Sequence, residues 1–129
     1  MTDPLTLQGL RVLVVEDEMM VSMLLEDMLA DLGCVMVGPA SRLGEAMAMA
    51  ESEDFDCALL DVNLAGQQSF PLADRLGERN TPFTYATGYG EAGLRPKDKG
   101  AIILMKPFRE SDLARVLGEM QSRLKAFGN

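Results

Sequence analysis

The chain has 129 residues, of which 20 are acidic and 12 are basic, and its formal net charge is −8. This length suits one domain and leaves no room for a second catalytic or DNA-binding domain, so we expect a single domain over residues 1–129 with its core at about 10–127. Binding to nucleic acid is not expected, because the Lys and Arg residues are scattered and affinity for a phosphate backbone needs them clustered.

The hydropathy pattern contains no candidate membrane segment. The longest apolar runs, such as residues 12–15 and 101–105, are far shorter than a bilayer span. Asp3 and Pro4 stand where a secretory signal peptide needs basic residues ahead of an apolar stretch. We therefore expect a cytoplasmic protein that does not contact a membrane.

Two residue types narrow the possible chemistry. The sequence has no His, which excludes a Ser-His-Asp triad, an imidazole general base, a His metal ligand and a role as a phosphohistidine donor. Its two cysteines, Cys34 and Cys57, lack the close pairing of a zinc or redox motif. We expect both to be small buried thiols.

Apolar runs of strand length alternate along the chain with segments of helical period. In chain order the predicted elements are strand 11–15, helix 18–32, strand 35–38, helix 41–53, strand 56–60, helix 69–78, strand 82–86, helix 91–98, strand 101–105 and helix 109–127. Five strands, each followed by a helix, predict right-handed crossovers and a parallel sheet covered on both faces. The helix at 91–98 is the weakest because Gly93 and Pro96 interrupt it, and we expect the segment 88–100 to be the moving part.

Six residues stand at the ends of four of the predicted strands, at the carboxyl edge where open parallel sheets bind their ligands. These residues are Glu16 and Asp17 after the first strand, Asp61 at the end of the third, Thr87 after the fourth, and Lys106 with Pro107 after the fifth. Any one of the acids could be an ordinary solvated loop residue, but three converging carboxylates repel one another unless a cation joins them. Hard oxygen ligands in this number suit Mg²⁺, and Lys106 adds a fixed positive charge beside them.

Four short motifs in the sequence resemble the signature of a known family. They are Val-Val-Glu-Asp-Glu at 14–18, Leu-Leu-Asp-Val-Asn at 59–63, Tyr-Ala-Thr-Gly at 85–88 and Lys-Pro-Phe at 106–108. In order and spacing they resemble the receiver domain of response regulators, and the likeness covers essentially the whole chain. Within that family, Tyr-Ala-Thr-Gly-Tyr-Gly at 85–90 resembles the FATGUY subgroup of single-domain regulators common in alphaproteobacteria, with Tyr85 where Phe is usual.

The resemblance implies both a fold and an activity. The fold is a flavodoxin-like (βα)5 three-layer α/β sandwich whose parallel sheet has the strand order 2-1-3-4-5. Asp61 would be the nucleophile that accepts a phosphoryl group from a histidine kinase or a histidine phosphotransfer protein. The chain would catalyse only its own phosphorylation and dephosphorylation, and we expect a monomer or a weak dimer.

The resemblance also assigns the metal ligands. Glu16, Asp17, Asp61 and the backbone carbonyl of Asn63 would hold Mg²⁺ beside the phosphorylation site. Glu16 would act through a water molecule, because its longer side chain replaces the Asp that is commoner in the family.

The residues that would respond to the phosphoryl group lie on the last two strands. Lys106 would pair with one phosphoryl oxygen, and the Thr87 hydroxyl would move to hydrogen-bond another. The Lys106–Pro107 peptide bond would be cis, an arrangement that only an X-Pro bond adopts at low cost. Ile103 stands where the family commonly has an aromatic residue that follows the threonine inward, and Tyr89 is the nearest aromatic alternative.

One flank of the first helix is the expected docking surface. Leu25 and Leu29 share a face at helical spacing and should pack on the sheet, which leaves Met20 and Leu24 nearer solvent. In receiver domains this flank and the loop after the fifth strand dock on the helical bundle of the kinase. The predicted docking residues are Met20, Leu24, Pro107 and Phe108.

Two alternative functions stay open at this point. A small Mg²⁺-dependent phosphatase of the haloacid-dehalogenase type also uses an aspartyl nucleophile, but it needs a second acid two residues later, where this chain has Asn63. A degenerate receiver would bind a partner without being phosphorylated. The sequence does not decide whether a functional receiver relays phosphate, drains it, or changes a partner when it is phosphorylated.

Overall fold

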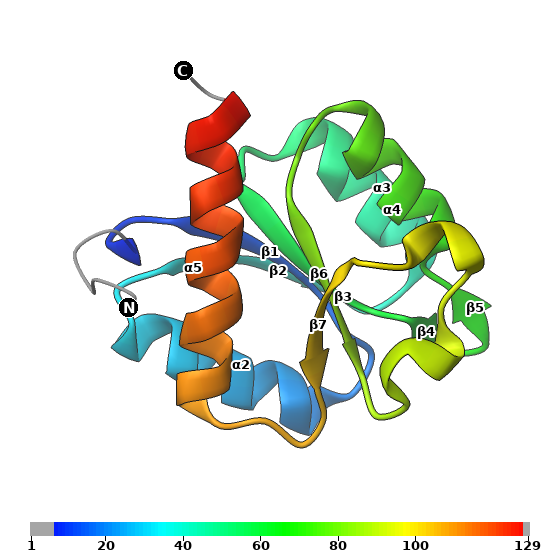
Figure 1. Ribbon diagram of the computed structural model, residues 1–129. Helices are drawn as coiled ribbons and strands as arrows, with labels where there is room; N and C mark the ends of the chain where they lie inside the picture. Colours follow the sequence, from blue (N-terminus) through cyan, green and yellow to red (C-terminus); the bar gives the residue numbers. More distant parts are fainter. Residues whose placement is uncertain (1–6, 128–129) are drawn as a thin grey trace.

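The computed structural model describes residues 7–127 (Figure 1). Its elements are β1 (Arg11–Val15), α2 (Met19–Asp31), β2 (Val35–Ala40), α3 (Leu43–Ser52), β3 (Cys57–Asp61), β4 (Asn63–Leu64), β5 (Gln67–Gln68), α4 (Phe70–Glu78), β6 (Phe83–Thr87), the 3₁₀ turns η1 (Gly90–Gly93) and η2 (Pro96–Asp98), β7 (Ile102–Met105) and α5 (Glu110–Phe127). The main sheet is parallel in the order β2-β1-β3-β6-β7, which confirms the predicted order 2-1-3-4-5. Helices α2 and α5 cover one face, and α3 and α4 cover the other (Figure 1).

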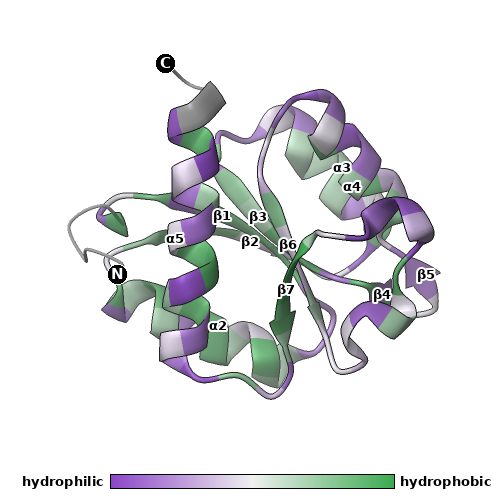
Figure 2. Ribbon diagram, in the orientation of Figure 1, coloured by the Kyte–Doolittle hydropathy of each residue, from purple (hydrophilic) through white to green (hydrophobic). Residues whose placement is uncertain are grey.

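The core is divided in two by the alternation of side chains along each strand. Val12 and Val14 belong to the cluster beneath α2 and α5, whereas Leu13 and Val15 belong to the cluster beneath α3 and α4. All four are at most 1% exposed, as a parallel sheet covered on both faces requires. The strands are mostly apolar, whereas the helices mix polar and apolar residues, and α2 carries apolar residues on its exposed side as well (Figure 2).

Helix α2 presents its two faces as predicted. Leu25 and Leu29 are buried on the sheet, and Met20 and Leu24 point toward solvent with exposures of 80% and 44%. Within residues 7–127, no helix combines the length and apolarity that a membrane crossing requires. Cys34 and Cys57 are free and buried, as expected, and burial raises the pKa of the Cys34 thiol to about 11.

The predicted helix at 91–98 is wrong. This segment contains η1 and η2, which are separated by Leu94 and Arg95 with extended ψ angles of 158° and 157°. Pro96 explains the break, because proline disfavours the helical conformation in the residue before it and has no N–H to donate. The domain therefore has four α-helices over its described residues rather than five.

Two further features were not predicted from the sequence. The strands β4 and β5 form a short antiparallel hairpin between β3 and α4. Strand β2 continues two residues beyond the predicted end, through a cis Gly38–Pro39 bond to Ala40. The Lys106–Pro107 bond is cis, as predicted.

The buried hydroxyl of Thr84 is expected to lower the stability of the fold. Thr84 on β6 is fully buried, and its Oγ has no hydrogen-bond partner among the described residues. Thr84→Val keeps the shape and removes an unsatisfied polar group, so we expect it to raise the free energy of unfolding by about 1 kcal/mol. Denaturant titration measures the change.

The control for this prediction is Thr81→Val at a half-buried position just before β6, where a change near zero is expected. A lower free energy of unfolding for Thr84→Val would mean that the hydroxyl is satisfied, for example by a buried water molecule.

Candidate functional site

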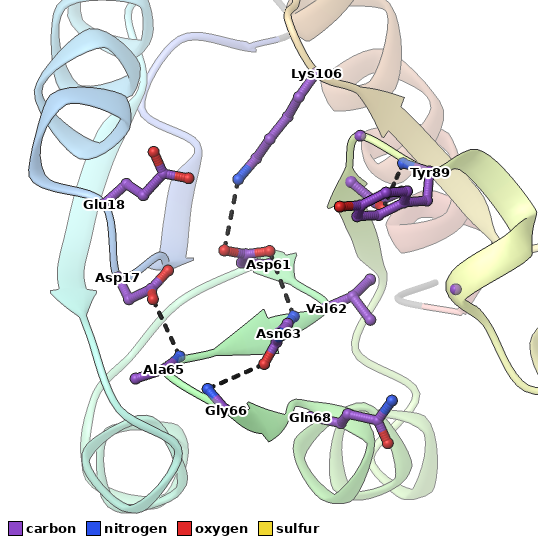
Figure 3. A pocket seen from close by; sticks show the side chains of 13 residues that line it. Asp17, Glu18, Asp61, Val62, Asn63, Ala65, Gly66, Gln68, Tyr89 and Lys106 are labelled. Carbon is purple, nitrogen blue, oxygen red and sulfur yellow. Dashed lines mark hydrogen bonds and ion pairs between the residues drawn. The ribbon is translucent and has the colours of Figure 1, made fainter.

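A pocket of about 960 Å³ opens at the carboxyl edge of the sheet. Its walls come from the β1–α2 loop, the end of β3 with the β4–β5 hairpin, the β6–η1 segment and the end of β7. Figure 3 shows Asp61 in the middle, Asp17 and Glu18 to one side, Tyr89 to the other, and Lys106 pointing toward Asp61. The structure therefore gathers side chains from four separate segments around Asp61.

Three carboxylates meet in this region. Oxygen atoms of Glu16, Asp17 and Asp61 lie within 4.8 Å of one another. Glu16 is only 2% exposed, and both of its oxygens are engaged: Oε1 accepts from Lys106 Nζ at 2.9 Å and Oε2 accepts from the Glu18 N–H at 3.1 Å. Lys106 Nζ also lies 3.5 Å from Asp61 Oδ2. One ammonium group thus faces two carboxylates.

The proton affinities of Asp61 and Lys106 reflect this crowding. Burial, and then the negative charge of Glu16, raise the pKa of Asp61 to about 7, although Lys106 opposes the rise. Burial alone lowers the pKa of the Lys106 ammonium, but its hydrogen bond to Glu16 and the charge of Asp61 hold that pKa above its ordinary value. Lys106 therefore stays charged at neutral pH, whereas Asp61 binds a proton far more readily than an ordinary aspartate does.

Thr87 lies at the edge of the pocket, next to the segment that follows β6. It is 4% exposed, and its Oγ accepts a hydrogen bond from the Tyr89 N–H at 3.0 Å. The Tyr89 side chain is 80% exposed beside the pocket. A movement of the Thr87 hydroxyl toward Asp61 would therefore release a backbone amide two residues further along the chain.

Backbone amides of the β4–β5 hairpin contact two of the acids. The Asn63 N–H donates to Asp61 Oδ1 at 3.4 Å, and the Ala65 N–H donates to Asp17 Oδ2 at 3.0 Å. The family resemblance implies only a carbonyl role for Asn63, and the sequence predicts no role for Ala65. Backbone donors leave no trace in residue type, so the Ala-Gly pair at 65–66 was the only signal for this turn.

The predicted docking residues divide into two groups. Met20, Leu24 and Pro107 are exposed, as a docking surface requires. Phe108 is only 9% exposed and belongs to the core cluster beneath α2 and α5, so its place in an exposed patch is wrong. Ile103, at the position of the usual aromatic residue, is half-buried on β7.

A partly buried ionic network, not predicted from the sequence, fixes η2 to its neighbours. The Tyr85 hydroxyl donates to Asp98 Oδ1 at 3.1 Å, and Arg95 Nε donates to Asp98 Oδ2 at 2.8 Å. Arg95 also makes two hydrogen bonds to Asp74 of α4, at 2.9 and 3.1 Å, and lies over the Phe70 ring. Residues 95–98 of the segment 88–100 are therefore anchored. The part of this segment that we expect to move is accordingly reduced to residues 88–94.

The fold and the site together define a class of protein. A parallel sheet of this order, with acids, a threonine and a lysine at the carboxyl ends of its strands, is a receiver domain. Residues 12–117 match the family model described as the response regulator receiver domain. The chain belongs to this family, which acts in two-component signalling, as its four sequence motifs predicted.

Curated relatives support the same family. The transcriptional regulatory protein PdtaR of Mycobacterium tuberculosis (strain H37Rv) is 33% identical over 119 residues, which cover 89% of this chain and 58% of PdtaR. The chain spans about half the length of the curated relatives it matches, since it covers 46% of the positive alginate biosynthesis regulatory protein of Pseudomonas aeruginosa.

Solved structures give the same result for the fold. SdrG from Sphingomonas melonis Fr1 is similar with a TM-score of 0.77 and 34% identity over 91% of this chain and 97% of SdrG. The response regulator PhyR from Brucella abortus gives a TM-score of 0.81 and 26% identity over 97% of this chain and 55% of PhyR. Membership of the FATGUY subgroup stays a prediction.

The raised pKa of Asp61 predicts how stability depends on pH in the absence of metal. The folded-state pKa is about 7 and the ordinary value is 3.8, so the folded state holds this proton more tightly. The tighter binding of this proton stabilises the folded state fully below about pH 4, and this stabilisation is lost as the pH rises through about 7. Asp61→Asn removes that loss and should raise the free energy of unfolding at about pH 8 by about 1 to 3 kcal/mol, measured by urea titration with a chelator present.

Asp54→Asn is the matched control, since it makes the same change of charge at an exposed position before β3. It should alter the free energy of unfolding much less than Asp61→Asn does. Equal or lower stability of Asp61→Asn at alkaline pH would contradict a shared acidic pocket.

Proposed function

We propose that Asp61 accepts a phosphoryl group from a histidine kinase or a histidine phosphotransfer protein, with Mg²⁺ bound beside it. The observation that carries this proposal is the meeting of Glu16, Asp17 and Asp61 within 4.8 Å, with Lys106 Nζ 3.5 Å from Asp61. In the reaction, an Asp61 oxygen forms a bond to phosphorus while the bond from phosphorus to the donor histidine nitrogen breaks.

The residues present fit a magnesium ion. All the candidate ligands are oxygens, and Mg²⁺ characteristically binds through one or two carboxylates and keeps several waters. Asp17 and Asp61 fit direct ligation, with the carbonyl of Asn63 as a third ligand. Glu16 fits contact through water, because its oxygens are already engaged by Lys106 and by the Glu18 N–H. When bound, the ion supplies positive charge that offsets the charge on the phosphoryl oxygens.

The side chains of the chain itself position and neutralise the transferred group. Lys106 already faces Asp61, so its ammonium can pair with a phosphoryl oxygen after a small movement. The Thr87 hydroxyl can donate to a second oxygen once it turns from the Tyr89 N–H. Neither step requires a proton to leave a side chain, which suits a reaction driven by orientation and charge.

The geometry weighs against the phosphatase alternative. A phosphatase of that type needs a second acid at the position of Asn63, and the Asn63 Oδ1 here accepts the Gly66 N–H at 3.1 Å. Its side chain serves the hairpin turn and offers no proton to a leaving group. A degenerate receiver is disfavoured because Asp61, Thr87 and Lys106 all line one pocket.

We propose that the partner docks on the amino-terminal half of α2. Met19, Met20, Met23 and Leu24 form an exposed apolar stripe there, here called the α2 stripe, with exposures of 76%, 80%, 56% and 44%. Methionine is common at adaptable binding surfaces. The exposed acids Glu18, Glu26 and Asp27 flank the stripe, so a partner helix with apolar and basic side chains fits it best.

Output through protein contact agrees with the relatives. The PhyR of Bartonella quintana, 26% identical with a TM-score of 0.77, is named an anti-anti-sigma factor. We propose that this chain likewise acts on a partner protein.

The phosphorylation site is tested with a small phosphodonor. Acetyl phosphate with Mg²⁺ should add one phosphoryl group to the unaltered chain and none to Asp61→Asn, as measured by intact mass. The Asp54→Asn variant should be modified as fully as the unaltered chain. A phosphoryl group on Asp61→Asn would place the acceptor elsewhere, and no modification of the unaltered chain would favour a degenerate receiver.

The docking surface is tested by separating protein donors from small ones. Met20→Asp and Leu24→Asp should each slow transfer from a phosphorylated histidine phosphotransfer protein about tenfold or more, since a buried interface anchor contributes about 1 to 2 kcal/mol or more. Transfer from acetyl phosphate should not change. Val35→Asp is the control, because Val35 is similarly exposed, at 42%, but begins β2 at the amino-terminal ends of the strands, whereas the α2 stripe begins next to their carboxyl ends. Equal slowing by Val35→Asp would exclude the α2 stripe as the docking surface.

A further inference from the structure

The β4–β5 hairpin is a short element that contacts two acids of the site. Asn63 pairs with Gln68 and Leu64 with Gln67, so only Ala65 and Gly66 form the turn. Both turn residues have positive φ, at 50° and 91°, as a two-residue turn of the primed type requires. The Gly66 N–H closes the turn on Asn63 Oδ1 at 3.1 Å.

The two contacted acids reach the pocket from different strands. Asp61 ends β3, whereas Asp17 follows β1. The hairpin gives each of them a backbone N–H, from Asn63 to Asp61 at 3.4 Å and from Ala65 to Asp17 at 3.0 Å (Figure 3). Asp17 benefits most, because its side chain is exposed and burial does not fix its orientation.

We infer that the β4–β5 hairpin is a positioning element that presets Asp17, and with it the cation site. This inference rests on the proposed function, since it concerns the carboxylates that would hold Mg²⁺. The Ala65 N–H fixes one oxygen of Asp17 and leaves the other available to a cation. It also stabilises a carboxylate that Asp61 and Glu16 repel. Groups that orient a metal ligand in this way commonly change metal affinity by about 10- to 100-fold when they are lost.

The turn can be weakened at Gly66, which lines the pocket but contributes none of the candidate cation ligands. At Gly66 a Cβ would meet nothing within 4 Å, so a substitution there causes no clash at that atom and strains the backbone, whose φ is 91°. Valine is poorly tolerated at such an angle because of its branched Cβ. Gly100 provides a matched control, since its φ is 90° and a Cβ there also meets nothing within 4 Å. It lies just before β7, at the amino-terminal ends of the strands and away from the pocket at their carboxyl ends.

The test is a calorimetric titration of Mg²⁺ into the unaltered chain, Gly66→Val and Gly100→Val. Gly66→Val should bind Mg²⁺ about tenfold more weakly than the unaltered chain. Gly100→Val should bind it as the unaltered chain does, although it carries a similar backbone strain. In the unaltered chain, the Ala65 amide resonance should shift on saturation with Mg²⁺, because its acceptor then shares charge with the cation.

Each result leads to a distinct conclusion. If the unaltered chain binds no Mg²⁺, the proposed function fails at its metal site. If the unaltered chain binds Mg²⁺ and Gly66→Val binds it as tightly as Gly100→Val, the hairpin does not position Asp17 and the inference is overturned. Should thermal unfolding show that Gly66→Val is unfolded at the titration temperature, Gly66→Ala against Gly100→Ala makes the same comparison with less strain.

Discussion

Repulsion among three carboxylates at one edge of the sheet is the constraint on which this structure depends. Lys106 compensates Glu16 and part of Asp61, but burial, together with the negative charge of Glu16, still raises the pKa of Asp61 to about 7. A cation and a transferred phosphoryl group would both enter a space already shaped by that charge. The site therefore holds unfavourable electrostatic energy in the absence of ligand, which the rest of the domain must offset.

The apolar interior of the sheet supplies that stability. Strands β1 and β3 are buried along almost their whole length; apart from the exposed Arg11 that begins β1, their residues are apolar until the carboxyl ends, where Asp61 ends β3 and Glu16 follows β1. The two core clusters therefore hold the strand ends in place while contributing no charge of their own to the pocket. This separation lets an acidic cluster sit next to a tightly packed core.

Much of this arrangement could be predicted because it follows from periodic patterns. Apolar runs predicted the strands, the family resemblance implied their order in the sheet, and the positions at strand ends predicted that Asp61, Thr87 and Lys106 are neighbours. The β4–β5 hairpin could not be predicted in this way, because two-residue strands show no period and its contacts use backbone amides. The burial of Phe108 depends on how its loop folds under the helices, and the broken helix at 91–98 on the conformation that Pro96 imposes.

The network around Arg95 limits which substitutions at positions 85 and 98 are compatible with each other in homologues. Asp98 is a buried acid that forms an ion pair with Arg95 and accepts a hydrogen bond from the Tyr85 hydroxyl. A homologue with Phe in place of Tyr85, the residue usual in the FATGUY motif, leaves the acid one donor short. Positions 85 and 98 should therefore change together across homologues, with an acid at 98 accompanying Tyr and a neutral residue accompanying Phe.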